Sequence, residues 1–164
     1  MEEVNEITSE EILPVEVADD IRIIYSDSAI LKVILEANHL ERFIGENPYI
    51  EMSQGVHVRF FNSLGDVESE LSSNYAVSYE NTDIMEAKED VVVVNKKGET
   101  LNTEHLIWEE KTEKIHTDEF VKITTEDEVI FGHGFESNQD FSKYRIKKIK
   151  GTIDLKDAES TEGS

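Results

Sequence analysis

The chain has 164 residues, of which 38% are hydrophobic and 32% are charged, and it contains no cysteine. This length supports one domain with a single sizeable core. The lack of cysteine excludes disulfides and thiolate metal sites, but it does not indicate whether the protein works in an oxidising or a reducing compartment. The net charge of -21 at pH 7 argues against nucleic acid and anionic membranes as primary partners.

The charge is distributed unevenly along the chain. Residues 1–20 contain eight acids and no base, whereas residues 143–150 contain five of the sixteen bases. No apolar run approaches the roughly 20 residues that span a bilayer, and the signal-peptide pattern is also missing. These features fit either a cytosolic chain or the mature part of an exported protein.

The composition predicts three parts. Residues 1–19 are acidic and show no useful hydrophobic period, so we expect a flexible lead-in or tether there. Residues 154–164 are polar, small and acidic, and we expect them to form a disordered tail. Between these two segments, residues 20–153 are expected to form the folded domain.

Alternation of apolar and polar residues begins after Asp20 and is typical of half-buried β-strands. Residues 38–48, with Gly45 and Pro48, are expected to form an irregular connection with one helical turn. Frequent turn signals and the lack of a convincing helical pattern predict an all-β, antiparallel architecture. The expected strands are 21–25, 31–37, 56–60, 67–80, 84–94, 100–109, 113–124, 127–136 and 141–153.

A hairpin-sized unit occurs over 71–93 and again over 101–123. Repeated units of this kind stack and cover one another's apolar faces. The alternation also slips by one residue near 103–104 and near 147–148, which predicts bulges that bend the strands. We therefore predict an all-β, twisted and partly open antiparallel β-jelly-roll. It would be a folded-over sheet with a V-shaped cross-section, an apolar inner face and disordered acidic termini.

A set of individually degenerate motifs, in a specific order, carries a family resemblance. The motif residues are Leu101, Thr103, Glu104, Leu106, Trp108, Ile115, Thr117, Val121 and Ile123, followed by 132–137 and 149–153. This order resembles the lipopolysaccharide-transport β-jelly-roll proteins, the LptC-like and OstA-like family. It is most similar to periplasmic component C of the lipopolysaccharide export complex, and the resemblance covers 22–153.

The resemblance implies a non-catalytic lipid carrier. Such a protein accepts lipopolysaccharide from the inner-membrane ABC transporter in an apolar groove and passes it to the periplasmic bridge protein. Each buried methylene of lipid A is worth about 0.8 kcal/mol, so acyl burial rather than phosphate binding is expected to supply the affinity. For any single expected lining residue, ordinary core packing is the favoured alternative, and in a narrow groove the two interpretations merge. These residues are Val56, Val58, Phe60, Val77, Tyr79, Val91, Val93, Leu106, Trp108, Ile115, Val121, Ile123, Phe131, Phe135, Tyr144 and Ile146.

Members of this family begin with an inner-membrane anchor, which this chain does not contain. The resemblance therefore implies a periplasmic domain that is tethered to the inner membrane by an N-terminal anchor absent from this chain. The soluble bridge protein itself is the first alternative. A β-sandwich protein or carbohydrate interaction module without lipid cargo is the second, although one tryptophan and five tyrosines are few for a sugar-binding platform.

The last expected strand, 141–153, is basic. Its cations could contact lipid phosphates or an acidic partner, or could protect an edge strand from unwanted pairing. We expect this strand to add to the edge of the bridge protein's sheet. The sequence does not decide whether the domain also forms a homodimer. The expected partner-edge residues are Phe141, Tyr144, Arg145, Ile146, Ile149 and Ile153.

Other chemistry has weak support in the sequence. Trp108, the only tryptophan, fits either a groove mouth or the core. Among the five histidines, His105 and His116 could approach each other, but two ligands are weak evidence for a metal. Carboxylate pairs such as Glu68 and Glu70 arise by chance among 37 acids, and nucleophile and phosphate-loop motifs are missing. We expect no enzymatic activity, no metal and no cofactor.

Overall fold

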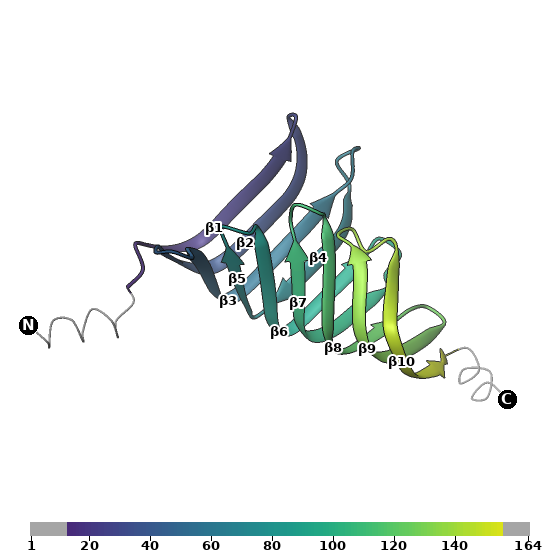
Figure 1. Ribbon diagram of the computed structural model, residues 1–164. Coiled ribbons are helices and arrows are strands. Elements are labelled where there is room, and N and C mark those ends of the chain that lie inside the picture. Colours follow the sequence, from purple (N-terminus) through teal and green to yellow (C-terminus); the bar gives the residue numbers. More distant parts are fainter. Residues whose placement is uncertain (1–12, 156–164) are drawn as a thin grey trace, which may run out of the picture.

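The computed structural model describes residues 13–155, which form an all-β domain (Figure 1). Neighbouring strands pair antiparallel throughout, so the predicted fold class is confirmed. The strands are β1 (Glu16–Asp27), β2 (Ile30–Phe43), β3 (Tyr49–Phe61), β4 (Val67–Ser73), β5 (Tyr75–Tyr79), β6 (Ile84–Asn95), β7 (Thr100–Glu109), β8 (Lys114–Thr124), β9 (Glu128–Asn138) and β10 (Tyr144–Asp154).

All ten strands belong to one sheet, in the order β1-β2-β3-β4-β6-β7-β8-β9-β10. β5 lies off this path and pairs with the first halves of β3 and β6. Apart from β4 and β5, strands that follow one another in the chain are neighbours in the sheet, which is the simplest way to connect antiparallel strands. Within residues 13–155, β1 and β10 are the two edges of the sheet.

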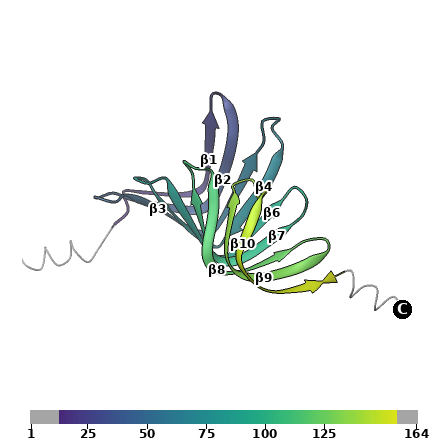
Figure 2. The ribbon, with the colours of Figure 1, turned by 45° about the vertical axis from the view of Figure 1, so that its right-hand side comes forward.

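The strands are interrupted halfway along their length, and the interruptions line up across the sheet. A bulge bends its strand, so a row of bulges at one level folds the whole sheet over. We call this row the fold line, and Figure 2 shows the strand halves spreading away from it. Its residues include Asn38, Gln54, Gly55, Asn74, Glu89, Asp90, Glu104, Asp118 and Glu119.

The fold line divides the sheet into two layers. Layer A contains β4, the first halves of β2, β7 and β9, and the second halves of β1, β3, β6, β8 and β10. Layer B contains β5 and the remaining strand halves. The two layers diverge from the fold line and face each other, which gives the predicted V.

Unusual backbone geometry accompanies the fold line. Gln54, Glu89 and Asp90 have φ values of +68°, +67° and +55°, in the left-handed region that bulges often use. Gly134, at the same level of β9, has a φ of +82°, and a Cβ atom there would lie 2.9 Å from Cδ of Lys147. Glycine therefore allows the Lys147 side chain to pack closely over β9.

Apolar side chains of both layers face one another and form a single core cluster. Because side chains alternate along a strand, a single strand half contributes at most three residues to it. Complete burial of one such side chain is worth about 1.5–3 kcal/mol, so the cluster holds the layers together. Its largest fully buried members include Phe60, Phe135, Phe141, Leu35 and Met52.

Four expectations about strand limits were wrong. β1 begins at Glu16, before the expected boundary at Asp20, and β2 continues to Phe43 through the segment expected to be irregular. β3 begins at Tyr49, well before the expected start at residue 56. The expected strand 67–80 is divided at Asn74. Residues 16–20 contribute no buried apolar side chain, and the bulge at Asn38 shifts the alternation in β2 by one residue, so neither segment shows a continuous apolar pattern. The remaining parts expected to be disordered, 1–12 and 156–164, lie outside the described residues.

The expected bulge near Thr103–Glu104 is confirmed by the register shift between β7 and β8. The bulge expected at 147–148 lies slightly later, between Ile149 and Gly151. The sequence-based placement failed because Ile146, Lys148 and Ile149 keep one continuous register with β9.

Candidate functional site

The interior face of the V contains thirteen of the sixteen residues expected to line an apolar groove. Most of them are fully buried, and Tyr144 and Ile146 are partly buried against the cluster. The residues in the cluster are Val56, Val58, Phe60, Val91, Val93, Leu106, Trp108, Ile115, Val121, Ile123, Phe135, Tyr144 and Ile146. The sequence alternation therefore located the interior surface well.

Val77 and Tyr79 lie on the outer face of layer B, which corrects their expected position. Val77 pairs in register with the outward-facing Glu86, and Ala76 belongs to the core cluster in its place. The interruption at Asn74 shifts the alternation by one residue, so the parity read from β4 does not carry over into β5.

Phe131 also lies on an outer face, that of layer A. It pairs in register with Lys122, whose neighbours Val121 and Ile123 are the inward, fully buried residues of β8. The ring of Phe131 stacks on that of Phe120, with 6.1 Å between centroids, and Phe120 is 48% exposed. Phe131 is therefore excluded from the interior.

An aromatic cluster joins the two layers. Trp108, from layer B, makes edge-to-face contacts with Tyr25 and Phe60, from layer A, at 5.8 and 5.2 Å between centroids. Trp108 is only 2% exposed, and its ring N–H donates to Oε1 of Gln139 at 3.0 Å. The single tryptophan is thus a core residue whose ring N–H points to the open side of the V. Its position combines the two predictions, a core residue and a residue at the groove mouth.

Two cavities flank this cluster on the side away from the fold line. One, of about 300 Å³, is lined in part by Tyr25, Trp108 and Glu110. The other, of about 400 Å³, is lined in part by Phe60 and by the loop between β9 and β10. Burial, with a contribution from nearby Asp83, raises the pKa of the Glu110 carboxyl to about 7. Polar side chains at the open side of the V, such as Glu110, are therefore partly shielded from water at the boundary of the apolar interior.

Within residues 13–155, β10 is an edge strand of the sheet. Ile149 and Ile153 are 61% and 51% exposed there. Phe141 does not belong to this edge, which corrects its assignment: it lies in the loop before β10 and is fully buried. Its φ of +56° turns the chain inward, and the sequence gives no sign of that conformation.

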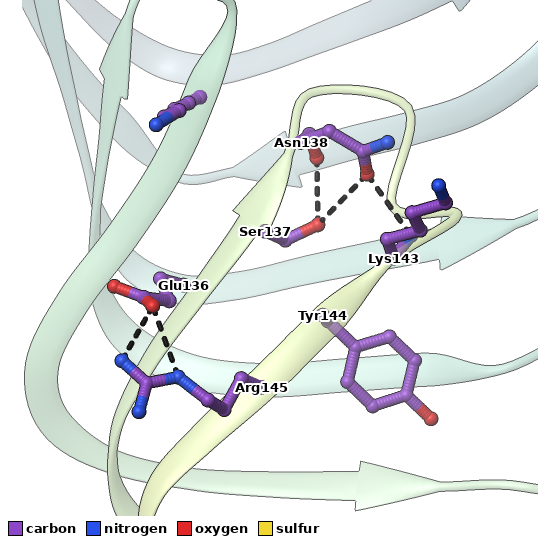
Figure 3. A pocket seen from close by; sticks show the side chains of 7 residues that line it. Glu136, Ser137, Asn138, Lys143, Tyr144 and Arg145 are labelled. Carbon is purple, nitrogen blue, oxygen red and sulfur yellow. Dashed lines mark hydrogen bonds and ion pairs between the residues drawn. The ribbon is translucent and has the colours of Figure 1, made fainter.

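A pocket of about 410 Å³ lies beside the start of β10 (Figure 3). Lys114, Lys143 and Arg145 line it together with Glu136. Nη2 of Arg145 lies 2.6 Å from Oε1 of Glu136, and this contact lowers the pKa of the Glu136 carboxyl. The pocket therefore carries an excess of positive charge in a strongly acidic protein, although its arginine already has a carboxylate partner.

Four of the five histidines pair with carboxylates, whereas the ring of His133 lies against that of Phe120. Nε2 of His105 lies 2.7 Å from Glu86, and Nε2 of His116 lies 2.6 Å from Glu109, so each binds a residue of a neighbouring strand. Within residues 13–155, no group of three or more histidine, aspartate, glutamate or cysteine side chains is arranged to hold a metal ion. The site thus consists of an apolar interior and two exposed edges.

Taken together, a folded-over antiparallel sheet, an apolar interior and free edge strands define a β-jelly-roll of the lipopolysaccharide-transport type. The chain belongs to the family described as Lipopolysaccharide-assembly, LptC-related, which matches residues 17–154. The predicted family is thereby confirmed, and with it an involvement in lipopolysaccharide transport. A comparison with curated proteins finds no match. In the described part of the chain, no helix has the length and apolar character needed to cross a bilayer.

Proposed function

We propose that this protein is a non-catalytic carrier that holds the acyl chains of lipopolysaccharide between layers A and B. It accepts the lipid from the inner-membrane ABC transporter and passes it to the periplasmic bridge protein. The observation that carries the proposal is the continuous apolar cluster, which runs from β2 to β10 between two layers that diverge toward one side. In this proposal the domain works in the periplasm, tethered to the inner membrane.

The energetics favour hydrocarbon over headgroup as the bound part. Burial of each methylene contributes about 0.8 kcal/mol, so several acyl chains together supply a large driving force. A net charge of -21 repels phosphate groups on average. Sugars and phosphates therefore stay in water on the open side of the V, while the tails enter the interior.

Photo-crosslinking with lipopolysaccharide tests the carrier function. Tyr25 and Tyr144 face the interior at opposite edges of the sheet, and both are only partly buried, so each tolerates a benzophenone side chain. Their strand neighbours Ile24 and Arg145 face outward and serve as matched controls. We expect lipid adducts at both tyrosine positions and none at the controls. Equal labelling at all four positions, or no labelling, would reject the carrier function.

The proposed transfer to the bridge protein uses β10. Strand addition supplies backbone hydrogen bonds to an unpaired edge, and the exposed Ile149 and Ile153 supply apolar contacts. Replacement of both isoleucines by aspartate should abolish binding of the bridge protein, measured by calorimetry. Phe120→Asp, at a residue of similar exposure on β8 rather than on the edge, should leave binding unchanged.

A further inference from the structure

The loop between β9 and β10, residues 139–143, crosses the open side of the V. It connects strand ends of layer B, yet inward-facing side chains of layer A bind it. The Ser69 hydroxyl of β4 donates to the Gln139 carbonyl at 3.1 Å, and the side-chain amide of Asn95, at the end of β6, donates to the Phe141 carbonyl at 3.0 Å. We call residues 139–143 the strap, because they tie the tips of the two layers together.

The strap is also fixed to layer B. The indole N–H of Trp108 donates to Oε1 of Gln139 at 3.0 Å, and the backbone N–H of Gln139 donates to the Glu113 carbonyl at 2.9 Å. Ser69 and Trp108 are 1% and 2% exposed, so these contacts lie inside the mouth of the V. The strap therefore closes the mouth from within.

Phe141 is the part of the strap that enters the core. It is fully buried, and its ring lies 5.7 Å from that of Phe135 and 4.8 Å from that of Tyr144, between centroids. Its φ of +56° is uncommon for a residue other than glycine. Phe141 thus fills apolar volume that an acyl chain of the cargo would otherwise occupy.

The strap restricts how a lipid can move through the domain. A lipid with its tails between the layers and its sugars in water must project through the open side. The strap closes that side at β4 and β6, which lie in the middle of layer A, with β1–β3 on one side and β7–β10 on the other. A lipid that moves from one edge of the sheet to the other must therefore pass the strap.

We propose that the strap is a gate, which detaches from layer A and withdraws Phe141 whenever cargo passes. This inference rests on the proposed carrier function and adds a moving segment to it. The strap is built to move as a unit, because Oδ1 of Asn138 accepts hydrogen bonds from the backbone N–H groups of Ser142 and Lys143 at 3.1 Å. These local bonds stay intact when the contacts to Ser69 and Asn95 break.

A disulfide across the mouth tests the gate, and the chain has no native cysteine to interfere. Ser69 is bonded to the peptide group that joins Gln139 to Asp140, so Ser69→Cys with Asp140→Cys links the strap to layer A. Asn102→Cys with Lys122→Cys is the matched control, since these residues pair in register on the outer face of layer A, away from the strap. The readout is the amount of lipopolysaccharide, delivered from the transporter at the β1 edge, that a photo-crosslinker captures at Ile146, an inward residue on the β10 side of the strap.

We expect oxidation of the Ser69→Cys/Asp140→Cys protein to reduce capture about tenfold or more, because the open state is no longer populated. Reduction of the disulfide should restore capture, and the control pair should capture like the wild type in both redox states. Unchanged capture by the oxidised cross-mouth variant, with normal capture by the wild type, would overturn the gate. Failure of the wild type to capture lipid would instead reject the carrier function, and the gate with it.

A second variant tests the same inference in the opposite direction. Ser69→Ala removes one contact between the strap and layer A and leaves the in-strap bonds in place. Loss of one such hydrogen bond should speed lipid capture about fivefold, measured by stopped mixing before photolysis. A rate equal to or below that of the wild type would contradict the gate.

Discussion

The two edges of the sheet have similar aromatic support and opposite charge. β1 carries four acids and one base, whereas β10 carries four bases and one acid. Tyr25 supports β1 through contacts with Trp108, and Tyr144 supports β10 through contacts with Phe135 and Phe141. The edges are therefore comparable in packing but not interchangeable in partner choice, since a basic edge selects an acidic neighbour.

This asymmetry gives edge-to-edge assembly a direction. A sheet that joins another through its basic edge keeps its acidic edge free for a different neighbour, as a relay requires. The same complementarity would let β10 of one copy meet β1 of a second copy. Self-association through these edges would then compete with the proposed binding of the bridge protein, because both would use β10.

The largest expected effect comes from the core beneath the basic edge. Phe135→Ala should lower the free energy of unfolding by about 3–5 kcal/mol, because Phe135 is fully buried and its loss leaves a cavity beside the rings of Phe141 and Tyr144. Phe120→Ala, at a 48% exposed ring on the outer face, should cost less than about 1 kcal/mol. Urea denaturation followed by circular dichroism measures both. Equal losses would mean that the inner and outer faces are not distinguished as described.

Charge reversal on the basic edge tests partner choice directly. Lys148→Glu with Lys150→Glu should weaken binding of the bridge protein about tenfold, or about 1.4 kcal/mol, with a smaller difference at high salt. Lys96→Glu with Lys97→Glu makes the same charge change at the turn between β6 and β7 and should leave affinity unchanged. Equal weakening by both pairs would show that net charge, and not the edge, controls binding.

The same contrast explains what could be predicted from the sequence. The strands β6, β7 and β8 were predicted to within two residues, because inward residues such as Leu106 and Trp108 alternate with polar ones. Alternation depends only on neighbouring residues in one strand, so it is readable from the sequence. The position of the interior face followed from it for thirteen of the sixteen candidate residues.

Features that depend on contacts between distant segments could not be predicted in this way. The shift of parity at Asn74 reflects a bend shared with β3 and β6, so Val77 was assigned to the wrong face. Phe141 was assigned to the β10 edge because it precedes Tyr144 in an apolar pattern. Its true position depends on a left-handed backbone and on a hydrogen bond from Asn95, forty-six residues earlier in the chain.

The aromatic supports of the two edges can be compared by removing one hydrogen bond from each. Trp108→Phe removes the donor to Oε1 of the partly buried Gln139 and also leaves a cavity, since Trp108 is 2% exposed, so a cost of about 1–3 kcal/mol is expected. Tyr144→Phe removes the bond from the Tyr144 hydroxyl to Glu99, whose carboxylate can bind water instead, so about 0.5–1 kcal/mol is expected. Urea denaturation measures the pair. A larger loss for Tyr144→Phe would show that the basic edge has the more buried support.

The smallest expected effect is a pH dependence confined to the acidic edge. Hydrogen bonds to Asp19, and then to Glu41, raise the pKa of His39, with Nδ1 at 2.6 Å and Nε2 at 2.9 Å from the two carboxylates. Because the pKa of His39 is higher in the folded state, protonated His39 stabilises the fold. This stabilisation is complete below the pKa of about 6.5 in the unfolded chain, and it is lost as the pH rises through the pKa of the folded state. Since Asp19 belongs to β1 and His39 to β2, the amides of β1 should exchange faster at pH 8 than at pH 6, after correction for intrinsic rates. β10 contains no histidine and should not change, and His39→Gln should remove the difference at β1. Equal acceleration at both edges would indicate a global loss of stability rather than a local release of the acidic edge.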